Sequence, residues 1–352
     1  MKILIVPDSF KGTLSSAEVC ECIKNGILQR ADAEIVTLPF SDGGEGFAEC
    51  LSNICNGEVL YTACTDIYGR RIKGHIFTYG KTAVIDCATA SGLQKKKDVM
   101  NATSYGTGEL INFAVLKGFR NIILGLGGTG CCDGGAGLLS ALGVKFRDIY
   151  GEIIDVPCGK DLENIYGANF ANHVKDISFT YACDVNNTYF GKNGAAYVFA
   201  PQKGADKNDV ERLDNGLKML NAFLPNDISK VKGAGAAGGI CGALYSVYGG
   251  EIKSGFEILT NAYKLKEKIK TADLVITGEG KTDKQTLMGK LPYKISQLCS
   301  KYNKKCVVIS GMIEDVKLGD KMICLVDKET TLEEALENPV KVLTDKAKFI
   351  LQ

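Results

Sequence analysis

The sequence predicts an α/β protein built on a largely parallel sheet. Short apolar segments of strand length alternate along the chain with longer segments whose apolar residues recur at helical spacing. Strands that alternate with helices in this way are typical of parallel sheets. Many of the 41 glycines gather in clusters that follow the predicted strands, at the edge where such a sheet binds its ligands.

The chain begins with a β-α-β pattern. Residues 2–6 form a short apolar strand, and residues 33–38 form a second strand. Ser15 or Ser16 caps the helix between them, because Glu18 then stands in the first helical turn, where its side chain can reach back to the cap.

The remaining elements follow from alternation, from short apolar runs and from helical spacing. Further strands are expected at residues 60–62, 72–77, 83–85, 121–126, 177–183, 272–277, 306–310 and 322–326. Further helices are expected at residues 47–54, 107–116, 133–142, 209–224, 236–247, 292–302 and 331–336. The apolar run at residues 195–199 could add one more strand.

Composition and charge exclude several classes of protein. Hydrophobic residues make up 45% of the chain and charged residues 24%, which is typical of a globular protein. The net charge is +1 without a basic stripe, so neither nucleic acid nor an anionic membrane is an expected partner. No segment approaches the roughly 20 apolar residues of a membrane span, and no signal peptide is present, so we expect a cytoplasmic protein.

The 14 cysteines are scattered along the chain and form no Cys-x-x-Cys pair. Because the chain has only two histidines, a zinc site of cysteines and histidines is hard to assemble. We expect reduced thiols that are mostly buried.

Six loops, most of them directly after predicted strands, combine glycine with acidic side chains, with lysine or with both. Phosphoryl transfer needs such loops, since carboxylates hold Mg²⁺, lysines offset phosphate charge and glycine amides cradle phosphate oxygens. The loops are residues 7–13, 39–46, 127–135, 184–187, 201–205 and 277–283. Their repetition along the chain predicts an active site that handles phosphate.

Two glycine patterns leave open a different enzyme. Residues 125–130 and residues 233–238 both fit G-x-G-x-x-G, which would suit a nicotinamide-dependent oxidoreductase. Against this alternative, the first match lies mid-chain, and no clear strand ends in an acid about 20 residues further on. The chain has no P-loop pattern, no protein-kinase motifs and no nucleophile elbow, which excludes those classes.

The glycine-rich loops resemble the motifs of the glycerate kinase family, of the glycerate 2-kinase type. The resemblance runs in order from the first strand to about Gly311. The matching segments are residues 7–15, 41–46, 184–187, 201–205, 233–239, 254–257 and 276–280.

This resemblance implies phosphorylation of D-glycerate that depends on ATP and Mg²⁺, with 2-phosphoglycerate as the expected product. It also implies two α/β domains with the active site in the cleft between them. A Rossmann-like (flavodoxin-like) domain is expected from both chain ends, residues 1–60 and 250–352, with a mixed α/β domain, residues 61–249, inserted into it. A homodimer is left open, and a non-catalytic homologue that binds sugar acids is a further alternative.

Three positions depart from the pattern of the family. Cys132 replaces an amide side chain, Lys281 replaces an arginine and Thr188 replaces a proline. A thiol is a weak hydrogen-bonding group, and lysine lacks the planar fork of arginine, so these changes bear on substrate affinity.

The loops suggest a role for each of their polar residues. Asp184 is the expected general base on the glycerate hydroxyl, and Lys11 and Asp8 complete the expected catalytic set. The expected metal ligands are Asp42, Glu45 and Asp133. The residues expected to bind nucleotide or substrate are Ser9, Lys11, Thr129, Asn186, Lys203, Glu279, Lys281 and Lys290. The same acids could instead cap helices or stabilise turns, and the lysines could be solvated surface residues.

Overall fold

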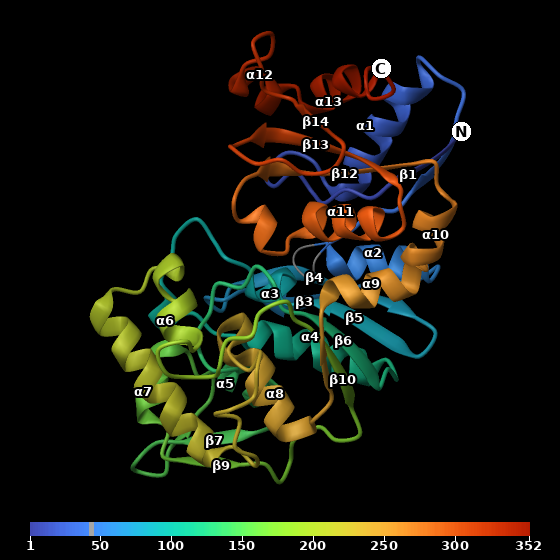
Figure 1. The fold of residues 1–352 in the computed structure, drawn as a ribbon. Helices are drawn as coiled ribbons and strands as arrows, with labels where there is room; N and C mark the ends of the chain where they lie inside the picture. Colours follow the sequence, from blue (N-terminus) through green and yellow to red (C-terminus); the bar gives the residue numbers. More distant parts are fainter. Residues whose placement is uncertain (42–45) are drawn as a thin grey trace. The chain divides into compact units, whose positions relative to one another are not determined.

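The structure is a computed structural model that describes residues 1–41 and 46–352. Its internal contacts divide the chain into two compact units. Unit 1 consists of Met1–Asp42 and Phe256–Gln352, and unit 2 consists of Gly43–Gly255. Both units combine sheets with helices, which confirms the predicted α/β class (Figure 1). The domain limits expected from the sequence stay a prediction.

Unit 1 contains a five-stranded parallel sheet in the order β14-β13-β12-β1-β2. The strands are β1 (Lys2–Ile5), β2 (Glu34–Thr37), β12 (Leu274–Thr282), β13 (Lys305–Ile313) and β14 (Lys321–Cys324). Counted along the chain within the unit, this is the 2-1-3-4-5 order of flavodoxin-like folds. The direction in which strands are added reverses between β1 and β12, and ligands of such sheets bind at that point.

Helices cover both faces of this sheet (Figure 1). The helices of this unit are α1 (Ser16–Leu28), α9 (Gly255–Tyr263), α10 (Leu265–Thr271), α11 (Leu291–Lys301), α12 (Leu332–Glu337) and α13 (Pro339–Ala347). Helices α1 and α13 pack together closely at Gly26, because a Cβ atom added there would lie 2.6 Å from the Cβ of Ala347. Helix α11 packs on β12 and β13.

Strands β12 and β13 are longer than predicted. The segment 277–283 was expected to be a loop, but β12 continues to Thr282 and pairs with β13 as far as Ile313. The reason lies in Gly278, where a Cβ atom would stand 2.0 Å from the carbonyl oxygen of Ile309. Glycine is therefore required here by close packing between neighbouring strands, whereas the sequence suggested a turn.

Unit 2 contains a six-stranded sheet in the order β11-β10-β6-β5-β4-β3 and a three-stranded sheet in the order β8-β7-β9. In the larger sheet, β4 runs antiparallel to both of its neighbours and the other pairs are parallel. The strands are β3 (Glu58–Thr65), β4 (Arg71–Tyr79), β5 (Thr82–Asp86), β6 (Asn121–Gly125), β7 (Lys145–Arg147), β8 (Ile153–Ile154), β9 (Gly167–Asn169), β10 (Ser178–Ala182) and β11 (Glu251–Lys253).

The helices of unit 2 include one segment that was expected to be a strand. They are α2 (Phe47–Ile54), α3 (Ala88–Ser91), α4 (Tyr105–Leu116), α5 (Ala136–Ala141), α6 (Ala195–Phe199), α7 (Lys207–Phe223) and α8 (Ile240–Tyr248). Segment 195–199 is α6, because the amide of Val198 donates to Gly194 and that of Ala200 donates to Ala196. An apolar run this short shows no period that could separate helix from strand.

Each unit has its own hydrophobic core. The cysteines are free thiols and are buried except for Cys55 and Cys324. Within residues 1–41 and 46–352, none of the helices has the length and apolar character needed to cross a membrane.

The start of α1 is fixed by the predicted cap. Ser15 accepts a hydrogen bond from the amide of Glu18 at 3.3 Å, and the Glu18 carboxylate accepts one from the amide of Ser15 at 2.8 Å. These bonds lower the pKa of Glu18 below its ordinary value. They also fix the point where the loop after β1 enters the helix.

We predict that Ser15→Ala lowers the stability of the protein by about 1 kcal/mol, as is usual for loss of an N-cap. The part of this contribution that comes from the Ser15 hydroxyl donating to the Glu18 carboxylate at 2.8 Å depends on pH. Because the pKa of Glu18 is lower in the folded state, this part is present above the unfolded pKa of about 4.3 and disappears as the pH falls through the folded value. Thermal unfolding of both proteins between pH 7 and pH 3 measures the difference. A gap in melting temperature that persists unchanged at pH 3 would contradict the prediction.

Candidate active site

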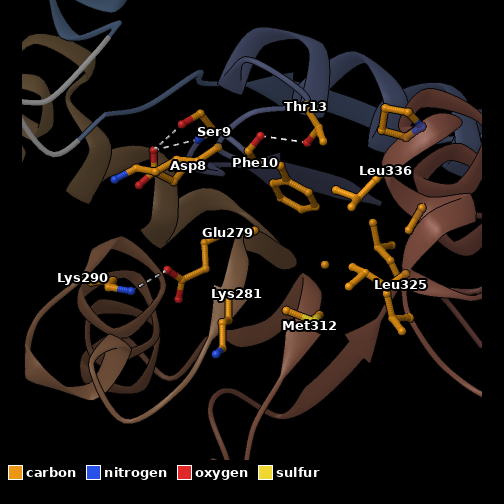
Figure 2. Close-up of a pocket in the computed structure, with 17 residues that line it drawn as sticks. Asp8, Ser9, Phe10, Thr13, Glu279, Lys281, Lys290, Met312, Leu325 and Leu336 are labelled. Carbon is orange, nitrogen blue, oxygen red and sulfur yellow. Dashed lines mark hydrogen bonds and ion pairs between the residues drawn. The ribbon is translucent and has the colours of Figure 1, made fainter. Parts of the chain in front are cut away.

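A cavity of about 370 Å³ opens in unit 1 at the point where the strand order reverses. Residues that follow β1, residues at the ends of β12 and β13, and residues of α12 line it (Figure 2). Six of the residues expected to act in the site line this cavity: Asp8, Ser9, Lys11, Glu279, Lys281 and Lys290. The topology of the sheet thus brings together two segments that lie at opposite ends of the chain.

The loop after β1 is held in a tight turn. Phe10 and Leu14 exchange backbone hydrogen bonds of 2.8 and 3.0 Å, and the Thr13 hydroxyl donates to the carbonyl of Phe10 at 2.8 Å. The carboxylate of Asp8 accepts a hydrogen bond from the amide of Ser9 at 2.7 Å. Lys11 is exposed within this turn and forms no ion pair with any residue of the two described ranges.

Glu279 is buried near the end of β12 and is held by several partners. One oxygen of its carboxylate accepts hydrogen bonds from the hydroxyls of Thr282 at 3.2 Å and Thr286 at 2.5 Å. Its other oxygen lies 3.5 Å from the ammonium group of Lys290. This network joins β12 to the short turn η5 (Thr286–Met288) and to the start of α11. The carboxylate is therefore fixed in place before any ligand binds.

Lys281 lies on the exposed side of the same strand end. Its ammonium group pairs with Glu314 at 2.9 Å, and this hydrogen bond raises the pKa of Lys281 above its ordinary value. Both Lys281 and Lys290 thus carry a positive charge with a carboxylate partner. Together with Lys11, they make the polar end of the cavity suitable for an anion with several charges.

In unit 2, a buried lysine organises the loop after β6. The ammonium group of Lys203 donates to the carbonyl of Cys131 at 2.7 Å and to the hydroxyl of Thr129 at 3.3 Å. Lys203 is 3% exposed and comes from the turn η3 (Pro201–Lys203). Two of the expected site residues, Thr129 and Lys203, are thus in direct contact.

Asp133 is fully buried beside this loop. Its carboxylate accepts hydrogen bonds from the amide and hydroxyl of Ser104 at 2.6 and 2.7 Å and from the amides of Gly135 and Gly137 at 3.1 and 3.2 Å. Burial raises the pKa of this carboxyl group, and the same hydrogen bonds oppose the rise. Asp133 connects the start of α4 to the start of α5, and its expected role as a metal ligand stays a prediction.

Asp184 lies two residues beyond the end of β10 and its side chain is exposed. Its carboxylate accepts hydrogen bonds from the hydroxyl of Ser254 and, at 3.0 Å, from the amide of Gly255. These donors lie just beyond β11, the neighbouring strand, so the carboxyl ends of two parallel strands fix the orientation of this acid. Asn186 is exposed in the loop that follows.

Cys132, which departs from the family pattern, lies in the interior of unit 2. Burial raises the pKa of its thiol to about 11, so the group is neutral near pH 7. The preceding residue packs against the glycine-rich segment 233–239, since a Cβ atom at Gly238 would lie 2.2 Å from the carbonyl oxygen of Cys131. Both thiols belong to the loop after β6 and are fully buried.

Asp86 is a buried acid that the sequence interpretation missed. It is the last residue of β5, and its carboxylate accepts a hydrogen bond from the amide of Ala48 at 3.1 Å, in the first turn of α2. An apolar strand that ends in an acid was the available signal, but this strand end carries no glycine cluster.

Two of the expected metal ligands, Asp42 and Glu45, lie outside the described residues. Among residues 1–41 and 46–352, no group of three or more histidine, cysteine, aspartate or glutamate side chains is placed to hold a metal ion. That the acids and lysines of unit 1 and those of unit 2 converge in one cleft stays a prediction.

The glycine pattern at residues 125–130 does not have the geometry of a dinucleotide-binding turn. In such turns a helix begins directly after the glycines and its N-terminus faces the pyrophosphate. Here the next helix, α5, begins only at Ala136 and is short. The second pattern contains Ala237 and Gly238 in the left-handed backbone conformation and does not follow a strand.

Comparison with known proteins agrees with the motifs. Residues 3–352 match the model of the glycerate kinase family. The chain is 41% identical over 328 residues to glycerate 2-kinase of Escherichia coli K12, covering 90% of this chain and 86% of that protein. It is 39% identical over 358 residues to glycerate kinase of Bacillus cereus, covering 95% and 93%.

A solved structure has the same fold. The crystal structure of a protein provisionally named glycerate kinase 2, from Salmonella typhimurium LT2, is similar with a TM-score of 0.83 and 37% sequence identity. The likeness covers 99% of this chain and 96% of that one. The motifs, the family model and these relatives agree, and the chain belongs to the glycerate kinase family.

Proposed function

We propose that the protein transfers the γ-phosphoryl group of ATP to D-glycerate and forms 2-phosphoglycerate. The observation that carries the proposal is the cavity of unit 1, where Lys11, Lys281 and Lys290 stand at the point of strand reversal. A triphosphate needs several fixed positive charges, and phosphoryl transfer depends mainly on positioning and charge neutralisation. Membership of the glycerate kinase family supports the choice of substrate.

In this proposal, the acids of the two units have different tasks. Asp184 accepts the proton of the attacking glycerate hydroxyl, because its carboxylate is exposed and yet held by Ser254 and Gly255. Glu279, with its two threonine donors, keeps Lys290 oriented toward the phosphates. Asp8 lies at the same end of the cavity, where it can bind substrate or a metal-bound water.

Mg²⁺, held by acidic side chains of the site, would supply positive charge that offsets the charge developing during transfer. Carboxylate oxygens are the donors it prefers, and the acids at the polar end of the cavity are of that kind. We keep Asp42 and Glu45 as the proposed ligands. Asp133 fits this role least, because its oxygens already accept hydrogen bonds from Ser104, Gly135 and Gly137.

The product identifies the reaction. We predict that ³¹P NMR of a reaction of the protein with ATP, Mg²⁺ and D-glycerate shows ADP and 2-phosphoglycerate in equal amounts, and that EDTA stops the reaction. If 3-phosphoglycerate forms instead, the proposed position of transfer is wrong. If neither product forms, a non-catalytic protein that binds sugar acids becomes the better explanation.

We predict that Asp184→Asn lowers kcat by about 10²- to 10⁴-fold, which is the usual contribution of a general base. Asparagine retains an oxygen that can accept the hydrogen bond from Gly255, so the melting temperature should change little. Asp227→Asn is a matched control, because Asp227 is an acid of unit 2 that stabilises an exposed turn through Ser229. A melting temperature that falls while kcat stays within tenfold would show that Asp184 is only structural.

We predict that Lys11→Met raises the KM for ATP by about 10- to 100-fold, because a charge-assisted hydrogen bond to a phosphate contributes about 1.5–3 kcal/mol. Lys24→Met is the control, since Lys24 pairs with Glu21 on the surface of α1. Steady-state kinetics with ATP varied measures the effect. A KM that changes less than twofold would remove Lys11 from the proposed site.

A further inference from the structure

The cavity of unit 1 has two chemically different ends (Figure 2). The charged residues Glu279, Lys281 and Lys290 gather at one end, whereas Phe10, Met312, Leu325 and Leu336 gather at the other. The apolar residues come from the loop after β1, from β13, from the segment after β14 and from α12. None of their side chains carries a charge, so these side chains suit an apolar group better than a phosphate or a carboxylate.

Helix α12 presents an apolar face to this end of the cavity. Leu332, Ala335 and Leu336 all line the cavity, and their spacing of three and four residues places them on one side of the helix. Ala335 is buried, but Leu332 is 45% exposed and Leu336 is 55% exposed. Leucine side chains left this open in a concave wall gain free energy when an apolar group covers them.

The charges next to this wall indicate which apolar group covers it. The apolar end belongs to the same cavity as the end with Lys281 and Lys290, and Lys11 also lines this cavity. A ligand that fills both ends would be apolar at one end and would carry negative charges at the other. A nucleoside triphosphate has this distribution, and the volume of about 370 Å³ falls within the usual range for small-molecule sites.

We propose that the apolar end is the site of the purine base, with the base between Met312 and Leu325 on one side and Leu332 and Leu336 of α12 on the other. A thioether makes a favourable contact with an aromatic ring, and the leucine side chains add area. The triphosphate then extends toward Lys11, Lys281 and Lys290. This inference rests on the proposed function, since it places the nucleotide of that reaction.

A substitution at Leu336 can distinguish the contribution of the base to binding from the contribution of the phosphates. Leu336 and Val340 are exposed to nearly the same extent, 55% and 54%, on neighbouring helices, but Val340 does not line the cavity. Glutamine is a good helix former, so both Leu336→Gln and Val340→Gln should fold. The affinities for MgATP and for inorganic tripolyphosphate are measured by titration calorimetry.

We expect Leu336→Gln to raise the Kd for MgATP by about tenfold, or about 1.4 kcal/mol, and to leave the Kd for tripolyphosphate unchanged. Val340→Gln should leave both unchanged. An unaltered Kd for MgATP in Leu336→Gln, or an equal loss for both ligands, would overturn the inference while the proposed function stands. A wild-type protein that binds no MgATP would overturn both.

Photolabelling with 8-azido-ATP locates the base without any substitution. We expect the label on peptides that contain residues 312–336. A label found only on peptides from residues 46–255 would place the base elsewhere, even if the protein is an active kinase.

Discussion

The parallel pairing of β1 with β12 is the interaction on which the geometry of unit 1 depends. It sets Leu4 opposite Val275, and the buried hydroxyl of Thr277 donates to the carbonyl of Val6 at 2.8 Å, from 271 positions further along the chain. Because both strands run in the same direction, the loop after β1 and the end of β12 meet at one edge of the sheet. This pairing brings Asp8 and Lys11 to the same cavity as Glu279, Lys281 and Lys290.

In both units, the buried charged side chains differ in their surroundings from the exposed ones. Glu279, Asp133 and Lys203 are buried, and each is held by several hydrogen bonds from or to nearby loops. A buried charge is tolerated only with such partners, so these residues fix the backbone of the loops. Lys11 and Asp184 are exposed, on the loops that follow β1 and β10. When a loop is already rigid, a ligand that binds to its exposed charges does not have to order it. The entropy lost on binding is therefore smaller.

The sequence predicted the fold class and most of the elements, because apolar spacing and caps are local properties. The cap at Ser15 and the helix 47–54 are examples. The prediction from the sequence was wrong where glycine can either form a turn or allow two strands to pack closely. Gly278 indicated a turn, but the structure shows that it allows β12 to approach β13 closely. The run 195–199 was too short to show a period, and it is a helix.

For the candidate site, the sequence identified six of the residues that line the cavity, since acids and lysines beside glycine are visible motifs. It did not identify the apolar end, because Met312, Leu325 and Leu336 are indistinguishable from core residues until the fold places them around a cavity. Asp86 was missed for a similar reason, since a single acid at a strand end attracts no notice without a neighbouring glycine. Which residues line the cavity depends on contacts between segments that are distant in the sequence.

The distance along the chain between β1 and β12 also determines the order in which the protein can fold during synthesis. The strands of unit 2 lie in one continuous segment and can pair as soon as that segment has left the ribosome. Strands β1 and β2 emerge first, but a pair of strands is too small to be stable alone. The apolar residues of β1 and β2 therefore cannot be buried in the sheet until β12, β13 and β14 have also been translated. Strands β1 and β2 therefore reach their final structure only after β12 has been made, although they precede all of unit 2 in the sequence.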